Sequence, residues 1–244
     1  MFSACYARLA TNISGNRLQL LTSYQINKDT CYELGNRLKK DKKLLVNIPT
    51  VEPILKRLTL EPQFMVGMVQ HNSIITGVIK LTSSLEFFLN DLVSLCMVRN
   101  NSLLKKGLKD IQINPFDIVE MDDLNKIREK YIGIITQDKC KGELWSKKLK
   151  RVCSFLEVSD KYYADSLNKA VDSIWMMRNT IAHGNSNRLV FVKDDVMYEH
   201  LEVSKEDEYI RFIEPFISIM DKLENLMEKL DLEALNKWSA QDSQ

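Results

Sequence analysis

The residue types most able to do chemistry are gathered in one short stretch, residues 178–184, with the sequence Arg-Asn-Thr-Ile-Ala-His-Gly. An arginine guanidinium can hold a phosphate through two hydrogen bonds, and a histidine imidazole exchanges protons near neutral pH. Asn179 adds a side-chain amide beside Arg178. Together with His183, these groups are a minimal set for cleaving RNA without a metal ion.

The position of Arg178 is unusual for a charged residue. Before it, apolar side chains recur at steps of three and four residues and form one stripe, made of Ala164, Leu167, Val171 and Ile174. Arg178 continues this stripe, and a desolvated guanidinium is costly unless an anion pairs with it. Two explanations stay open: a phosphate site, or a structural arginine that pairs with a carboxylate such as Glu86 or Asp91. In the second, His183 and Gly184 only end a helix.

The spacing of the motif limits what one helix can do. Asn179 and His183 are four residues apart and share a helix face. Arg178 and His183 are five residues apart, which turns them about 140° from each other on a straight helix. A site that uses both therefore needs a distorted helix end or a second copy of the motif from a dimer partner.

The composition is that of an ordinary globular protein and favours helices. The chain has 244 residues, of which 45% are apolar and 27% charged. Only 8 glycines and 5 prolines are present, which favours helices over a turn-rich β architecture. The net charge of +1 gives no molecule-wide attraction for nucleic acid, so such binding needs a local patch.

The cysteines, the histidines and the chain start bear on compartment and cofactors. The 5 cysteines are scattered without metal-ligand spacing, which is typical of free thiols in a reducing compartment. His71 and His200 lack metal-ligand neighbours and are expected to be structural. The chain start does not resemble a secretory signal, and no stretch approaches the roughly 20 apolar residues of a membrane span. We therefore expect a cytoplasmic protein with no metal, no cofactor and no membrane partner.

Hydrophobic periodicity predicts an all-α helical bundle built on two long antiparallel helices. One is predicted over residues 64–99, and the other over residues 160–183, with Gly184 in a left-handed conformation at its end. Shorter helices are expected between them. After the motif, two apolar runs flank residues 194–195 and indicate a small β-hairpin, and a last helix follows.

Three parts are predicted along the chain. Residues 1–62 form an accessory N-terminal segment, because short helical patterns and a basic run at residues 37–43 are followed by three prolines. Residues 63–235 form the helical domain, and residues 236–244 form a C-terminal tail.

The motif resembles the signature of a known family. The pattern Arg-Asn-x-x-Ala-His at the end of a long helix is similar to that of the HEPN superfamily. Its members are small helical-bundle domains in toxin–antitoxin, abortive-infection and CRISPR-associated ribonucleases. Residues 84–92 also resemble the first core helix of stand-alone HEPN proteins, where an acidic residue often lies near the site. The resemblance runs from about residue 64 to residue 230.

The resemblance implies a role for each residue of the motif. Arg178 would bind phosphate and stabilise the transition state, Asn179 is the polar residue that usually follows, and His183 would be the acid/base or orienting group. Glu86 is either the acidic partner of this site or a polar residue on an exposed helix face. The implied activity is a metal-independent endoribonuclease, in which attack by a ribose 2′-hydroxyl leaves a 2′,3′-cyclic phosphate.

The same resemblance implies partners and a biological role. It points to a homodimer that acts on RNA as a toxin or abortive-infection, anti-phage effector, with an antitoxin or another protein as regulator. Asn185 stands where toxins controlled by a nucleotidyltransferase antitoxin often carry tyrosine, so control by modification of that tyrosine is not expected. Two alternatives stay open: a non-catalytic HEPN module that binds RNA or a protein, and a helical scaffold in which the motif only ends a helix.

A second candidate site is the basic stretch at residues 145–151. It combines a ring that can stack on a base with cations that can contact phosphates, and its candidate RNA-binding residues are Trp145, Lys147, Lys148, Lys150 and Arg151. The alternative is a solvated helix face with Trp145 and Leu149 packed inward. The basic run at residues 37–43 has the same two interpretations.

Overall fold

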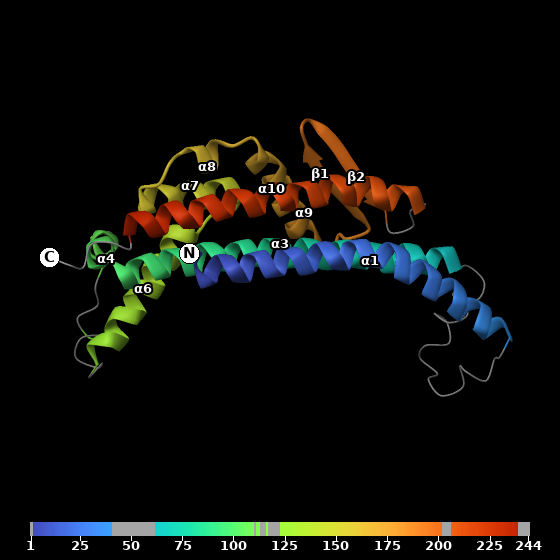
Figure 1. Ribbon diagram of the computed structural model, residues 1–244, viewed down its shortest axis with the longest axis horizontal. Helices are drawn as coiled ribbons and strands as arrows, with labels where there is room; N and C mark the ends of the chain where they lie inside the picture. The colour runs from blue at the N-terminus through green and yellow to red at the C-terminus, as the bar shows by residue number, and fades with distance from the viewer. Residues whose placement is uncertain are drawn as a thin grey trace.

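The body of the protein is a set of three long helices. Its computed structural model describes residues 2–40, 62–109, 111–112, 116, 123–201 and 206–238. The long helices are α1 (Ala4–Lys40), α3 (Pro62–Arg99) and α10 (Glu206–Trp238). They lie side by side, and α1 runs antiparallel to the other two (Figure 1). The predicted all-α fold is confirmed. Of the two long helices predicted, the one over residues 64–99 is α3, and the other two long helices of the bundle are α1 and α10.

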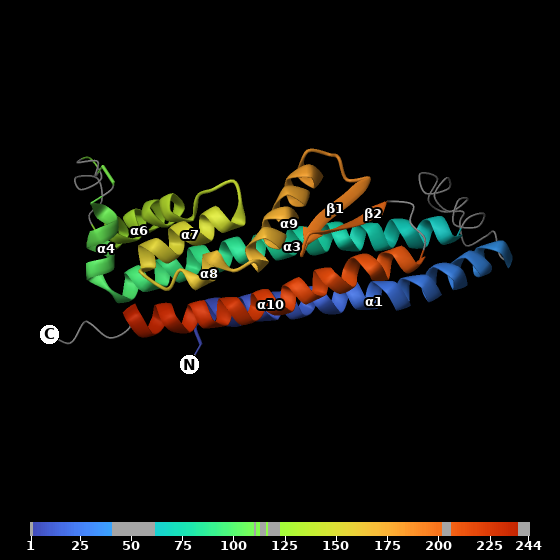
Figure 2. The same cartoon turned by 90° about the horizontal axis from the view of Figure 1, so that it is seen from above.

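The shorter elements cover the remaining side of α3. They are α4 (Asn101–Leu108), α6 (Leu124–Cys140), α7 (Trp145–Leu156), α8 (Lys161–Ala164), α9 (Leu167–Ala182), β1 (Arg188–Lys193) and β2 (Val196–Leu201). Figure 2 shows α6, α7 and α9 on one side of α3, with α1 and α10 on the other. The helix that carries the motif, α9, therefore rises from the middle of the bundle.

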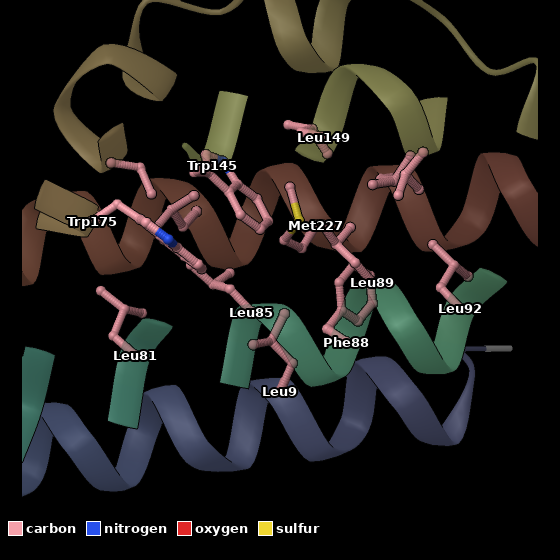
Figure 3. Close-up of a cluster of buried hydrophobic side chains, with 14 of the residues drawn as sticks. Leu9, Leu81, Leu85, Phe88, Leu89, Leu92, Trp145, Leu149, Trp175 and Met227 are labelled. Atoms are coloured by element: carbon pink, nitrogen blue, oxygen red, sulfur yellow. The ribbon is translucent and has the colours of Figure 1, made fainter. Parts of the chain in front are cut away.

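One continuous apolar core joins these helices. Trp145 of α7 and Trp175 of α9 stack with their ring centroids 5.9 Å apart, above the α3 residues Leu81 and Leu85 (Figure 3). These side chains are almost completely removed from water. Burial of each large apolar side chain stabilises the fold by roughly 1.5–3 kcal/mol. The two tryptophans thus fix α7 and α9 to α3 directly below the motif.

The N-terminal helix α1 belongs to the same core. Its buried positions recur at alternating steps of three and four residues, at Tyr6, Leu9, Ile13, Asn16, Leu20 and Ser23. Asn16 lies at a close contact between α1 and α3, where its Nδ2 donates to the Gly77 carbonyl at 2.8 Å. A Cβ atom on Gly77 would lie only 3.1 Å from Asn16 Oδ1. A helix face interrupted by polar Asn16 and Ser23 explains why the sequence indicated only short helical patterns here.

The predicted division of the chain into three parts stays a prediction. The structure shows that parts of the predicted N-terminal segment and of the predicted C-terminal tail pack against the helical domain. Residues of the predicted accessory segment between Cys5 and Tyr24 pack in the core, and residues 41–61 lie outside the described part. At the other end, α10 continues into the predicted tail. Trp238 is buried there, and its Nε1 donates to the Leu156 carbonyl at 2.7 Å.

The motif helix is shorter than predicted. Residues 161–164 form the separate helix α8, and α9 begins only at Leu167. Asp165 between them is extended, with ψ at 135°, and its Oδ1 accepts a hydrogen bond from the Leu167 amide at 2.8 Å. Aspartate favours such side-chain caps over the helix interior. The expected continuous helix from residue 160 is therefore interrupted at this aspartate.

The predicted β-hairpin is confirmed. β1 and β2 pair antiparallel, with Lys193 opposite Val196 across a two-residue turn. Asp194 and Asp195 have φ of 50° and 61°, as a tight turn of type I′ requires. On its inner face, Phe191 packs edge to face against Phe212 of α10.

By length and composition α3 could cross a membrane, although the sequence showed no such stretch. The segment Val66–Arg99 meets this criterion, and 56% of its most apolar window is buried inside the bundle. The core helix of a helical bundle has the same character, so the feature is weak support for a membrane span.

Candidate active site

The motif occupies the last turn of α9, and backbone hydrogen bonds fix where this helix ends. The Gly184 amide donates to the Ile181 carbonyl at 3.0 Å, and the Asn185 amide donates to the Thr180 carbonyl at 3.1 Å. Gly184 has a φ of 80°, in the left-handed region that favours glycine. These bonds form a Schellman motif, and Gly184 has the left-handed conformation predicted for it.

Arg178 is partly buried and has no carboxylate partner among the described residues. Its Nη1 donates to Asn179 Oδ1 at 3.3 Å. The two carboxylates considered from the sequence are engaged elsewhere, because Asp91 pairs with Arg8 and Glu86 pairs with Lys148. The guanidinium is thus positioned at the end of α9, and no carboxylate of the described residues compensates its charge.

His183 caps α9 and is exposed to solvent. Because α9 is a regular helix as far as Ala182, the distorted helix end considered from the sequence is not seen. On such a helix Arg178 and His183 are turned about 140° apart. One chain therefore presents an arginine and a histidine to two different sides of the same helix end.

Glu86 is linked through Lys148 to the part of the core that contains Trp175. Its Oε1 accepts a hydrogen bond from Lys148 Nζ at 2.6 Å, and the same ammonium lies 5.3 Å from the centroid of the Trp175 ring. The Lys148 side chain is only 13% exposed. Glu86 thus neutralises a partly buried cation, and the structure brings it near α9 without bringing it to Arg178.

A buried histidine pair supports the loop that follows the motif. His71 Nε2 makes a short hydrogen bond to the Ser186 carbonyl, and His71 Nδ1 lies 3.1 Å from His200 Nδ1. A carbonyl only accepts, so His71 Nε2 carries the proton. In the neutral pair His200 Nδ1 must then donate to His71 Nδ1, and His200 Nε2 is a buried acceptor for which the described residues provide no partner. The sequence could not show this pair, because its members are 129 residues apart.

The basic stretch on α7 is divided between two faces of its helix. Trp145 is buried, and its Nε1 donates to Asn168 Oδ1 at 2.9 Å, so its ring is not accessible to a base. Lys148 faces the core and pairs with Glu86. The remaining cations, Lys147, Lys150 and Arg151, are exposed on the opposite face. The structure therefore keeps three of the five candidate RNA-binding side chains on one outer surface.

A groove of about 550 Å³ runs beside the motif, between α9 and β1. Met176, Met177 and Val190 give it apolar walls, and Asn185 and Arg188 add polar groups at the end next to the motif. Arg178 and His183 lie outside its lining.

In the part of the chain that the structure describes, the remaining reactive side chains form no second chemical centre. Among the described residues, no group of three His, Cys, Asp or Glu side chains is arranged to hold a metal ion. The thiols of Cys96, Cys140 and Cys153 are buried, and burial raises the pKa of each to about 12. They are therefore protonated and unreactive at neutral pH.

Comparison with known families decides the broader assignment. Residues 36–229, which include the motif, the histidine pair and Glu86, match the family described as RiboL-PSP-HEPN. The chain belongs to this HEPN family. No curated protein and no solved structure matches it.

Membership in this HEPN family supports a nuclease or RNA-related role and a coarse assignment as a ribonuclease-like enzyme. It also shows that the HEPN region begins at residue 36, within α1, and ends within α10.

Proposed function

We propose that this HEPN protein is a metal-independent endoribonuclease that acts as a homodimer. The observation that carries the proposal is the end of α9, where a partly buried arginine without a carboxylate partner in the described structure precedes an exposed histidine by five residues. A phosphodiester would supply the anion that Arg178 lacks.

In the proposed reaction, the ribose 2′-oxygen attacks the adjacent phosphorus while the bond from phosphorus to the 5′-oxygen breaks. The products are a 2′,3′-cyclic phosphate and a 5′-hydroxyl. Arg178 stabilises the charge on the phosphoryl oxygens, and His183 acts in the proton transfers that remove the 2′-hydroxyl proton and protonate the leaving 5′-oxygen. Asn179 holds the guanidinium through its side-chain oxygen.

A homodimer would allow one site to use both an arginine and a histidine of the motif, although Arg178 and His183 of one chain point to different sides of the helix end. A second copy placed against the end of α9 would bring the arginine of one protomer to the histidine of the other. Ile79 and Phe87 are candidate contacts of such a dimer, because they are 44% and 61% exposed on the α3 face that also carries Ser83 and Glu86.

The cellular role that we propose is that of a toxin or abortive-infection effector, held in check by an antitoxin or another protein regulator. This role follows from the HEPN assignment. The second candidate, a non-catalytic HEPN module that binds RNA or a protein, is favoured by the separation of Arg178 and His183 within one chain.

The experiment that tests the reaction uses matched substrates in EDTA. Single-stranded RNA should be cut, whereas the same strand carrying one 2′-deoxy nucleotide at the mapped cleavage position should resist cutting there. Mass spectrometry of the products should show a 2′,3′-cyclic phosphate. Cleavage of the 2′-deoxy position, or products ending in a 5′-phosphate, would exclude the proposed attack by the 2′-hydroxyl.

A further inference from the structure

A groove of about 650 Å³ lies between α6 and α7 and reaches α4. It is lined by six cationic side chains and one carboxylate, that of Asp138. The cations come from three separate parts of the sequence and are Lys106, Lys139, Lys141, Lys147, Lys150 and Arg151. The protein as a whole carries a net charge of only +1, so this groove concentrates positive charge on one surface.

Part of this charge is compensated within the groove. Lys106 pairs with Glu157 at 2.7 Å, and Lys141 pairs with Asp138. These pairs hold the pKa of the Glu157 and Asp138 carboxyls below their usual range. The two carboxylates therefore stay charged at neutral pH and partly compensate the cations on the α4 and α6 side, because Asp138 also pairs with Lys139 and Glu157 also pairs with Lys237.

The cations on the α7 side are not compensated. Lys147, Lys150 and Arg151 are exposed, and none of them forms an ion pair with another described residue. Arg151 Nη1 donates to the Lys141 carbonyl at 3.1 Å, which orients its guanidinium at the edge of the groove. Three solvated cations on one helix face repel one another, and bound phosphates would relieve that repulsion.

We propose that this groove, named here the α6–α7 groove, binds the sugar–phosphate backbone of the single-stranded RNA substrate. The inference rests on the RNA substrate of the proposed function. The ring available in the groove, that of Phe155, is only 5% exposed and lies under Lys106 and Lys139, whose Nζ atoms are 5.6 and 5.7 Å from its centroid. Among the described residues that line the groove, the aromatic ring is thus covered by lysines, and the groups that the groove offers to RNA are its cations.

Two consequences follow from contacts to phosphates alone. Binding is independent of base sequence, and single-stranded DNA binds the groove as well as RNA does. Discrimination between RNA and DNA then arises at the motif, where the reaction requires a 2′-hydroxyl. Figure 2 shows α6, α7 and α9 on the same side of α3, so a strand held in the α6–α7 groove can continue toward the end of α9.

The test measures binding separately from cleavage. A His183→Ala protein keeps the RNA intact, and a fluorescent single strand of about 20 nucleotides is titrated at roughly 50 and 200 mM salt. Adding Lys147→Glu, Lys150→Glu and Arg151→Glu should weaken binding at least about tenfold. The slope of log Kd against log salt should fall by about 2, because each phosphate contact on a single strand contributes about 0.7.

The matched control changes three exposed cations of α10, with Arg211→Glu, Lys222→Glu and Lys229→Glu in the same background. This control changes the net charge by the same amount as the groove variant. The slope of log Kd against log salt should stay that of the His183→Ala protein. If the triple groove variant does not fold, Lys147→Glu alone should still weaken binding by about threefold and lower the slope by about 0.7.

The groove proposal is overturned if the groove variant binds RNA as tightly as the α10 variant, or if the His183→Ala protein binds no RNA. These results leave the proposed function standing wherever the wild type still cleaves. Conversely, loss of binding in the groove variant together with no cleavage by the wild type would support the groove and contradict the ribonuclease.

Discussion

His71 Nδ1 and His200 Nδ1 lie 3.1 Å apart inside the protein, and the other nitrogen of His71 binds the loop three residues after the motif histidine. Burial and the neighbouring His71 lower the pKa of His200 to about 4. The loop that follows the motif is therefore held by a buried histidine pair in which the neutral form of His200 is favoured.

This pair predicts that stability falls in mild acid. An unfolded histidine has a pKa of about 6.5, so the unfolded chain binds more protons than the native one between pH 6.5 and 4. The stability that the neutral form of His200 contributes is complete above about pH 6.5 and is lost as the pH falls toward 4. Between pH 7 and 5 the free energy of unfolding should drop by about 2 kcal/mol, measured with urea. In His200→Phe this drop should largely disappear, whereas the exposed-site variant His183→Ala should retain it. An equal drop in His200→Phe would assign the effect to other groups.

The left-handed conformation of Gly184 predicts opposite effects of alanine at two glycines. At Gly184, with φ at 80°, alanine should destabilise the protein by about 1 kcal/mol. At Gly15, inside α1 and with no atom within 4 Å of the place that an added methyl group would take, alanine should stabilise by about 0.5–1 kcal/mol. Thermal unfolding of both variants beside the wild type measures the difference. A Gly184→Ala protein as stable as Gly15→Ala would contradict the Schellman geometry.

The pairing of Glu86 with Lys148 predicts a coupled effect on stability. Glu86→Gln leaves a partly buried ammonium without its carboxylate, and Lys148→Met leaves the carboxylate without its ammonium. A double-mutant cycle by urea unfolding should give a coupling of about 1 kcal/mol. Because Glu86 is engaged by Lys148, Glu86→Gln should reduce RNA cleavage far less than His183→Ala. Equal losses in the two variants would make Glu86 a member of the active site.

The angle between Arg178 and His183 predicts complementation between inactive proteins. If each site combines Arg178 of one protomer with His183 of the other, mixing Arg178→Ala and His183→Ala proteins after subunit exchange creates dimers with one intact site. Half of the dimers are then mixed and each has one of two sites, so activity should recover to about a quarter of the wild type. Each variant alone should be inactive. A mixture that stays inactive after proven exchange would show that each site lies within one protomer.

Local signals allowed the end of α9, the hairpin and the long helix α3 to be predicted. Gly184 after His183 marked the helix end, and Asp194-Asp195 between apolar runs marked the turn. Two features that the sequence did not show depend on polar side chains whose places become clear only in the structure. The polar positions Asn16 and Ser23 hid the continuity of α1, and Asp165 divided the predicted motif helix through a local side-chain cap.

In the candidate site, the residues adjacent in sequence could be predicted, whereas the contacts between distant residues could not. The motif was recognisable because its residues are adjacent in sequence. The pairing of Glu86 with Lys148 spans 62 residues, and the one from His71 to His200 spans 129, so no local pattern could predict them. Trp145 is a further example, because helical spacing allowed it to stack on RNA and only packing against Asn168 and Trp175 shows it to be buried.

The central claim is that Arg178 and His183 cleave RNA, and one measurement tests it most directly. Purified wild-type protein, His183→Ala and the control variant Lys169→Ala, which changes an exposed residue of the same helix, are incubated with labelled single-stranded RNA and total tRNA in EDTA. We predict cleavage by the wild type and by Lys169→Ala, and a loss of at least about 100-fold in His183→Ala. Equal cleavage by all three proteins would contradict the account, because the motif would then be no more than the end of a helix.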